Sequence, residues 1–351
     1  MNKTNWSLFV PIHNLEISRD IGGELRVENV VFISSDKIPF IRKRLGLPEK
    51  VSYYRSRITP IGDKGLFSGA KVYAFLKSRR CPEDNLTHEF RRIKEAVCVL
   101  ASSQMYRLSR HERILFGGPE YGNILLDDYF LFSNSNKDWK YCPMRLDSIK
   151  PYRLDKQWKR QLSSHFFPRL LRILNGEISV SPKWRFSLRN AALLGGLSCL
   201  SRNIWESFMY DMVAIELLLT KRGEPFPDTV LDRMMTFFGW LTDWSPRPWK
   251  DLIKRLYKLR NKFVHAGRIT DITGLDIINA DMLLANLLNT LCSLTKLIKS
   301  KEDIIELTNK LAACKVLGIK FKGGPKQLTF HKQTWLKQDI EKLERRRHWL
   351  W

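Results

Sequence analysis

Hydrophobic and polar residues follow two different patterns along the chain, and the pattern changes near residue 150. Before that point, short apolar runs alternate with turn-forming clusters such as IGGE, FGGPEYGN and SNSNKD. The apolar runs are SLFVPI, ELRVENVVFIS, KVYAFL and ILLDDYFLF. Runs of this kind predict β-strands, whereas residues 86–107 carry an apolar stripe at helical spacing and predict a helix. We therefore expect an α+β domain over residues 1–150.

After residue 150, apolar residues recur at the three- and four-residue spacing of helices. Helices are expected over residues 155–174, 182–201, 203–223, 229–241, 249–265, 276–300 and 301–314. Pro168 is expected to kink or split the first, Pro182 to begin the second and Gly223 to end the third. A proline-rich connector, RGEPFPD, precedes the fourth, and SKED supplies a capping box for the last. The expected fold is an α+β N-terminal domain followed by an all-α helical bundle over 151–318 and a basic, aromatic tail over 319–351.

The overall charge narrows the class of partner. The 351 residues include 60 Lys and Arg against 36 Asp and Glu, a formal net charge of +24. Such an excess favours polyanions, either nucleic acid or an anionic membrane surface. The longest apolar run considered, AALLGGLSCL, is about half of the roughly 20 residues that a membrane helix needs. The apolar run near the N-terminus is short and broken by Pro11, so we expect a cytoplasmic protein without a membrane span.

The six cysteines are scattered, with no Cys-x-x-Cys pair and no accompanying His-x-x-x-His. This arrangement predicts free thiols rather than a zinc site or a disulfide framework. We expect neither a metal nor a cofactor.

The hexapeptide RNKFVH, residues 260–265, lies near the end of an expected amphipathic helix. At 100° per residue with Arg260 at zero, an apolar stripe between about −40° and −100° contains Leu252, Leu256, Leu259 and Phe263. Tyr257, Asn261 and His265 fall near +60°, +100° and +140°. Residues 241–270 also contain eight Lys and Arg but only two Asp. The helix therefore has one packing face and one basic, polar face.

The polar face suits the cleavage of RNA without a metal ion. The substrate supplies its own nucleophile, the 2′-OH beside the scissile phosphate. An imidazole, whose ordinary pKa is about 6.5, can take or give a proton at neutral pH. A guanidinium can hold the phosphate with two hydrogen bonds, and an amide can orient the imidazole or bind a phosphate oxygen. Each chain has one such histidine, so a two-fold dimer is expected to supply the second acid–base group.

Chance alone accounts for an Arg-x4-His pattern in a chain of this composition, and RQLSSH at 160–165 is a second case. RNKFVH differs because Asn261 directly follows the arginine. A histidine at the end of a helix can also serve only to stabilise the helix dipole, which is the structural alternative for His265.

The segment LYKLRNKFVHAG resembles the corresponding region of HEPN domains, in particular the Apea-like group, whose members carry Arg-Asn-x-x-x-His after an LY-x-x-R lead-in. Upstream, MVAIELLL is similar to the family's earlier helix with its ALE-x-L core. The resemblance covers residues 184–315. It implies a helical bundle that dimerises with both Arg-x4-His motifs lining a shared cleft.

HEPN proteins of this kind are commonly metal-independent endoribonucleases of bacterial antiviral defence or toxin–antitoxin systems, leaving a 2′,3′-cyclic phosphate and a 5′-OH. The resemblance therefore implies catalytic roles for Arg260, Asn261 and His265. It also implies that Glu216 orients Arg260 or His265, although a solvated Glu216 is the alternative. Tyr257 is expected to support the site as a wall residue. The expected RNA-binding residues are Lys258, Lys262, Arg268, Arg345, Arg346 and Arg347.

The expected partners are RNA, a second copy of the chain, and an inhibitor, antitoxin or phage-derived activator. Residues 1–150 resemble N-terminal regions fused to Apea-like domains, which implies a recognition or sensor role.

One competing function is a catalytically silent, RNA- or DNA-binding dimeric regulatory subunit that uses the HEPN fold for dimerisation. Its support is the C-terminal tail, where three arginines at 345–347 precede Trp349 and Trp351 and could bind phosphate and stack bases. The tail could instead be an amphipathic helix that packs on the body. A metal-dependent nuclease at Glu120, Asp127 and Asp128 lacks the following (D/E)-x-K, and GGPEYG lacks the ending of a phosphate-binding loop.

Overall fold

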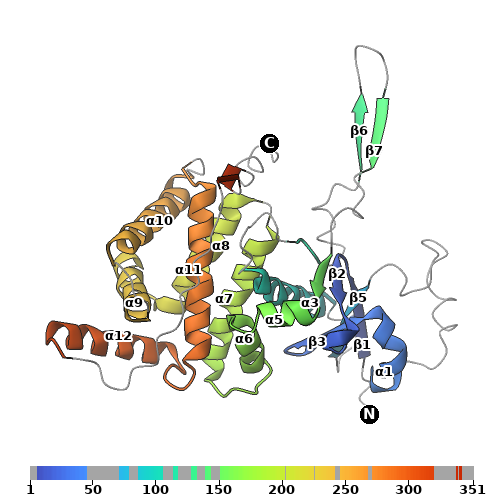
Figure 1. The fold of residues 1–351 in the computed structure, drawn as a ribbon, viewed down its shortest axis with the longest axis horizontal. Coiled ribbons are helices and arrows are strands. Elements are labelled where there is room, and N and C mark those ends of the chain that lie inside the picture. Colours follow the sequence, from blue (N-terminus) through green and yellow to red (C-terminus); the bar gives the residue numbers. More distant parts are fainter. Residues whose placement is uncertain are drawn as a thin grey trace. The chain divides into compact units, whose positions relative to one another are not determined.

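The computed structural model shows an N-terminal region with small sheets and a predominantly helical remainder (Figure 1). The residues that it describes are 6–45, 71–78, 86–105, 114–117, 128–132, 139–143, 151–201, 203–224, 226–241, 246–267, 271–319, 337–338 and 340–341. They form ten α-helices and eight strands. The chain divides into two compact units, residues 1–97 with 114–161 and residues 98–113 with 162–351. The functional boundaries expected at 150 and 318 stay predictions.

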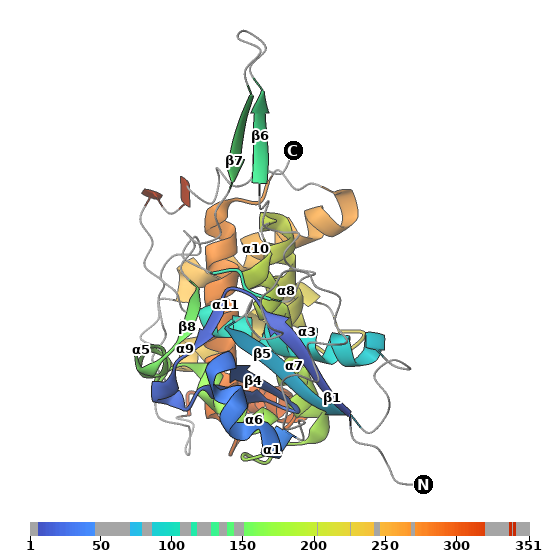
Figure 2. The same ribbon diagram turned by 90° about the vertical axis from the view of Figure 1, so that its right-hand side faces the viewer.

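The N-terminal unit contains a four-stranded antiparallel sheet in the order β1-β5-β4-β3 (Figure 2). Its strands are β1 (Trp6–Ile12), β3 (Glu24–Val27), β4 (Val30–Ser34) and β5 (Val72–Ser78). These confirm three of the four predicted strand runs, with one difference. The run ELRVENVVFIS, expected as one segment, forms the β3–β4 hairpin, because the chain reverses at Glu28, whose φ is 54°. A small core of Ile33, Ile38, Tyr73 and Phe75 packs on this sheet.

Two further strand pairs belong to this unit. The strands β2 (Leu15–Ile17) and β8 (Tyr152–Leu154) pair in parallel, although they lie far apart in the sequence. The strands β6 (Asp128–Phe132) and β7 (Trp139–Pro143) form an antiparallel pair. The helices of the N-terminal unit are α1 (Ile38–Leu45), α3 (Leu86–Ala101) and α5 (Lys156–Gln161). The last turn of α3 belongs to the helical unit. The short apolar runs before residue 150 thus correspond to strands of the N-terminal unit.

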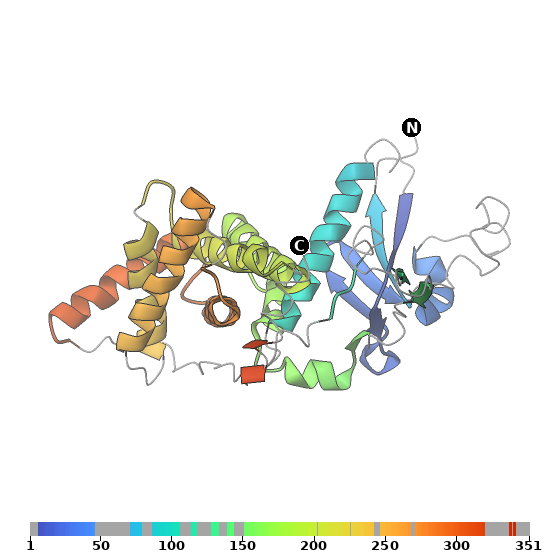
Figure 3. The same cartoon turned by 90° about the horizontal axis from the view of Figure 1, so that it is seen from above.

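The helical unit is built around one central helix. Its helices are α6 (Phe166–Leu174), α7 (Pro182–Leu200), α8 (Ile204–Leu219), α9 (Phe226–Leu241), α10 (Pro246–Ala266), α11 (Gly274–Ser293) and α12 (Lys301–Val316). Eighteen of the twenty residues of α11 are buried. Figure 3 shows α11 end-on, with α8 and α10 beside it, and α11 also contacts α6, α7 and α9.

By length and composition alone, α11 could cross a membrane, and it is the one described helix that meets this test. However, 94% of its apolar window is buried inside the protein, as expected for the core helix of a bundle. The sequence had pointed instead to AALLGGLSCL, in α7, as the longest apolar run.

Three helix boundaries differ from the sequence prediction. The break between α5 and α6 lies at residues 162–165, before Pro168, which occupies the first turn of α6. Proline is tolerated there because the first backbone N–H groups of a helix have no partner within it. The connector RGEPFPD was also predicted too long, since α9 already begins at Phe226. Finally, α11 ends at Ser293 and not at residue 300.

Two glycines allow α7 to approach the preceding chain closely. A Cβ added at Gly196 would lie 1.6 Å from the carbonyl oxygen of Cys98, at the end of α3. A Cβ at Gly195 would lie 2.8 Å from the Sδ atom of Met105. Residues 102–104, between these two contact points, form a short 3-10 helix that also contacts α7. Backbone packing at this distance requires glycine at position 196.

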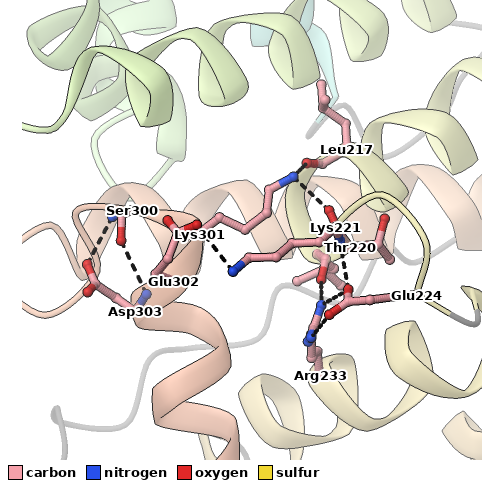
Figure 4. A network of polar contacts seen from close by, with 10 residues as sticks. Leu217, Thr220, Lys221, Glu224, Arg233, Ser300, Lys301, Glu302 and Asp303 are labelled. Carbon is pink, nitrogen blue, oxygen red and sulfur yellow. Dashed lines mark hydrogen bonds and ion pairs between the residues drawn. The ribbon is translucent and has the colours of Figure 1, made fainter.

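Side chains from two later helices cap the C-terminus of α8 (Figure 4). Lys301, the first residue of α12, donates from Nζ to the carbonyls of Leu217 and Thr220, both at 2.7 Å. Arg233 of α9 donates to the carbonyl of Leu219 and also forms two hydrogen bonds with Glu224, at 2.7 and 2.8 Å. Positive charge at this end satisfies free carbonyls and complements the helix dipole. The last turn of α8 is therefore fixed by α9 and α12.

Candidate functional site

The helix α10 carries the RNKFVH motif and ends as the sequence predicts. Gly267 adopts a left-handed conformation, with φ of 61°, and its N–H donates to the carbonyl of Phe263 at 2.9 Å. This arrangement is a common way to end a helix with glycine. His265 consequently lies in the last helical turn, where its side chain is exposed.

The buried face of α10 is rotated from the predicted apolar stripe. Leu256 and Leu259 are buried as expected, but Leu252 and Phe263 are only partly buried. Ile253 and Tyr257 are buried instead, with 1% and 3% of their surface exposed. The reason is that α10 packs against both α9 and α8, so its buried sector extends beyond the leucine stripe.

This rotation turns Arg260 toward the interior, where it pairs with Glu216 in the last turn of α8. Arg260 Nη2 donates to Glu216 Oε2 at 3.1 Å, and Nε lies 3.0 Å from Oε1 without hydrogen-bond alignment. The side chains are 20% and 9% exposed. Burial raises the pKa of Glu216, while the charge of Arg260 acts in the opposite direction. Arg260 Nη1 also donates to Asn261 Oδ1 at 3.3 Å.

Tyr257 lies beside this ion pair. Its hydroxyl is buried and has no hydrogen-bond partner within the described part of the chain. Burial, together with the nearby charge of Glu216, raises the pKa of the phenol well above its ordinary value. The Tyr257 hydroxyl therefore stays protonated at neutral pH and is unsuited to act as a general base.

A groove of about 550 Å³ runs between α9 and α10. It is lined by Asp228, Leu231, Ile253, Lys254, Tyr257, Lys258, Asn261, Lys262, His265 and Ala266. Three lysines follow one another at four-residue spacing along α10, against one carboxylate from α9. Lys254 and Lys258 are exposed, whereas Lys262 pairs with Asp271 at 2.8 Å. Its lining thus carries more cationic than anionic side chains, which favours an anionic ligand, while most of the surface that it exposes is apolar.

The structure brings most of the candidate residues of α10 together, but not all. Asn261 and His265 line the groove, as do Tyr257, Lys258 and Lys262. Arg260 does not line it and pairs instead with Glu216. Arg268 and the arginines at 345–347 lie outside the described residues.

Sequence analysis missed two charged residues of the groove. Lys254 stands one helical turn before Lys258, so it could have been found by extending the helical spacing of the lysines. Asp228 was assigned to the connector RGEPFPD, whereas it lies in the first turn of α9. The acidic residue near a helix start, a common feature of N-terminal turns, was the available signal.

Two contacts hold the groove-bearing helix against the chain that follows it. Arg255 of α10 donates from Nε and Nη2 to the two carboxylate oxygens of Asp276, at 2.9 and 3.2 Å. This hydrogen bonding raises the pKa of Arg255. Asp276 is buried and forms a capping box with Thr273 at the start of α11. The Lys262–Asp271 pair adds a second tie to the same segment.

The described residues also include a polar cavity and several cysteines outside the groove. No group of three or more His, Cys, Asp or Glu side chains among the described residues is placed to hold a metal ion. Cys98, Cys199 and Cys292 are buried, and Cys314 is partly buried. In the N-terminal unit a cavity of about 540 Å³ is lined by charged and hydroxyl side chains, among them Glu16, whose carboxylate pairs with Lys71 and Arg153.

Comparison of the chain with protein-family models, with curated proteins and with solved structures gives no match. The fold and the groove therefore carry the functional argument.

Proposed function

We propose that the helical unit is a HEPN-like, metal-independent endoribonuclease. It cuts RNA by attack of the 2′-OH on the adjacent phosphate and leaves 2′,3′-cyclic phosphate and 5′-OH ends. The observation that carries this proposal is the meeting of His265 and Asn261 in one lysine-rich groove of about 550 Å³.

Each part of the groove has a role in this reaction. Lys254 and Lys258 are exposed and attract the phosphates of the RNA backbone. His265 exchanges a proton with the reacting oxygens. Asn261 binds a phosphate oxygen or orients the imidazole, and its position is steadied by the hydrogen bond from Arg260.

The position of Arg260, paired with Glu216 and outside the groove lining, changes the role that we propose for it. While it is paired with Glu216, it positions Asn261 and holds α10 to α8. To stabilise charge on the phosphate directly, its guanidinium would have to exchange the carboxylate for the substrate. We therefore propose a positioning role for Arg260 in the arrangement seen in this structure, with the phosphate contact as a separate step.

We further propose that the ribonuclease is a cytoplasmic homodimer of a bacterial antiviral defence or toxin–antitoxin system. An unrestrained ribonuclease would damage its own cell, so an inhibitor, an antitoxin or a phage-derived activator is expected. The N-terminal unit is the proposed sensor. Normal growth of cells that strongly express the wild-type chain alone would argue against either the activity or the restraint.

The test uses purified wild type, His265→Ala and His88→Ala, each incubated with total RNA in EDTA. His88 is another exposed histidine, on α3, and serves as the matched control. We expect cleavage by wild type and His88→Ala, with cyclic-phosphate ends, and loss of at least 100-fold in His265→Ala. Equal cleavage by all three would point to a contaminating nuclease and contradict the proposal.

One observation favours the alternative of a catalytically silent, RNA- or DNA-binding regulatory subunit. Arg260, the expected catalytic arginine, is used in an interior ion pair rather than in the groove. In that case lysines would carry the affinity, and removal of His265 would change binding little. RNA binding by wild type and His265→Ala with equal affinity, and cleavage by neither, would support this alternative.

A further inference from the structure

The groove contains a carboxylate whose role the proposed function leaves open. Asp228 lies in the first turn of α9 and is exposed. It lines the same groove as His265, which comes from the last turn of α10. The two helices pack side by side, as Figures 1 and 3 both show, and contact one another directly. Asp228 and His265 therefore line the same groove from two neighbouring helices.

Asp228 and His265 are the carboxylate and the imidazole among the side chains that line the groove. The other charged groups that line it are Lys254, Lys258 and Lys262, all from α10. Tyr257 is excluded as a base by its buried, protonated hydroxyl. Asp228 and His265 are both exposed, so both are accessible to a bound substrate.

Cleavage by the 2′-OH needs two proton transfers. One group must take the proton from the attacking 2′-oxygen, and another must give a proton to the departing 5′-oxygen. With a single histidine in the groove of each chain, a dimer would be required to provide both groups. A carboxylate that lines the same groove from the neighbouring helix removes that requirement.

We propose that Asp228 is the general base and His265 the general acid of one groove, so that each protomer holds a complete acid–base pair. This inference rests on the proposed ribonuclease function. The Asp228 carboxylate takes the 2′-OH proton as the 2′-oxygen bonds to phosphorus. The bond from phosphorus to the 5′-oxygen breaks, and the His265 imidazolium protonates that oxygen. Proton exchange with water then returns Asp228 to carboxylate and His265 to imidazolium.

The first test compares Asp228→Asn with Asp232→Asn. Asp232 is also exposed on α9, one turn further along, and does not line the groove. Cleavage of a short single-stranded RNA is followed under single-turnover conditions in EDTA between pH 5 and 9. We expect Asp228→Asn to cleave at least 100-fold more slowly than wild type throughout this range and to bind RNA within about threefold of wild type. Asp232→Asn should match wild type.

A second substrate separates the two roles. In an RNA with sulfur in place of the scissile 5′-oxygen, the leaving group is a thiolate and needs no proton. His265→Ala should recover most of its rate on this substrate, whereas Asp228→Asn should not. Recovery by Asp228→Asn instead would reverse the assignment and overturn the proposal.

Mixing the two inactive variants tests whether both groups belong to one protomer. A mixture of Asp228→Asn and His265→Ala should stay inactive, because no groove in it holds both groups. Restored activity would show that the pair is shared between protomers and contradict the inference.

Failure of the inference and failure of the proposed function give different results. If wild type cleaves and Asp228→Asn cleaves equally well, the inference alone is wrong. If wild type does not cleave RNA at all, the proposed function is wrong and the inference fails with it. Thermal unfolding of each variant verifies that its fold is intact, and Asp228→Glu, which keeps a carboxylate, should retain part of the activity.

Discussion

Glu216 on α8 and Arg260 on α10, 44 residues apart, form a buried ion pair with contacts of 3.0 and 3.1 Å. The pair joins the two helices that carry the motifs resembling HEPN domains. Loss of one partner leaves a buried charge without compensation, whereas replacement of both by apolar residues does not. The arginine of the motif is therefore a structural contact as well as a candidate catalytic residue.

Arg260→Ala should lower the free energy of unfolding by roughly 2–4 kcal/mol, because Glu216 is left buried and unpaired. The double variant Glu216→Leu/Arg260→Met should lie within about 1 kcal/mol of wild type. Urea unfolding at pH 7 measures both. Loss of activity in Arg260→Ala is thus weak support for catalysis unless the fold is checked. A double variant as unstable as Arg260→Ala would contradict this view of the pair.

The same measurement repeated at lower pH tests the state of Glu216. Burial raises the pKa of this carboxyl in the folded protein, and removal of Arg260 should raise it further. The folded state then binds a proton more readily than the unfolded state, so stability increases as the pH falls through the folded pKa. The cost of Arg260→Ala should therefore shrink between pH 7 and pH 5.

Lys254 and Lys258 should contribute to RNA affinity through phosphate contacts. Replacing both by alanine should flatten the dependence of log K on log salt concentration by about 1.4, because each phosphate contact on a single strand contributes about 0.7. Binding titrations between 50 and 300 mM KCl give this slope. The matched control is Lys296→Ala/Lys299→Ala, two exposed lysines after α11, whose slope should equal that of wild type. Equal flattening in both variants would mean that the groove lysines have no special role.

The Glu224–Arg233 contact should stabilise the protein in a pH-dependent way. Hydrogen bonds from Arg233 lower the pKa of Glu224 to about 2 from an ordinary 4.5. The folded pKa is depressed, so the stabilisation is complete above pH 4.5 and is lost as the pH falls toward 2. Glu224→Gln should cost about 1–2 kcal/mol at pH 7, allowing for solvent screening, and much less at pH 3. Urea unfolding at both pH values measures this cost. A cost that is the same at pH 7 and pH 3 would exclude the ionisation of Glu224 as the source of the pH dependence.

Two adjacent glycines of α7 should respond very differently to alanine. Gly196→Ala places a methyl group 1.6 Å from a backbone carbonyl, which cannot move without displacing α3, so a loss of about 3 kcal/mol or more is expected. Gly195→Ala meets the flexible side chain of Met105, and part of its cost is offset by the better helix propensity of alanine. Thermal unfolding of the two variants should place Gly196→Ala far lower. Equal melting temperatures would contradict the close approach at Cys98.

Local sequence patterns predicted much of the secondary structure. Reciprocal hydrogen bonds between Ser300 and Asp303 confirm the capping box in SKED, and Pro182 begins α7 as expected. Contacts between distant segments could not be predicted. The parallel pairing of β2 with β8 is one example, because nothing in either three-residue strand identifies its partner. The rotation of the α10 packing face is another, since helical spacing does not tell which helices flank it.

The candidate site, like the fold, could be predicted from the sequence only in part. The spacing of Asn261 and His265 on one face was readable from the sequence, and both line the groove. The inward position of Arg260 was not readable, because it depends on a carboxylate contributed by another helix. Asp228 was missed because Pro225 and Pro227 favour a connector, while proline is equally compatible with a first helical turn.

The cap on α8 has a consequence for the order in which the protein can mature. Lys301 is synthesised more than eighty residues after the carbonyls that it caps. While the chain is still emerging from the ribosome, the last turn of α8, which carries Glu216, lacks its final restraint. Chains interrupted before residue 301 are thus expected to leave this turn frayed and exposed to proteases. The motif arginine, Arg260, is therefore expected to reach its final position only when the chain is nearly complete.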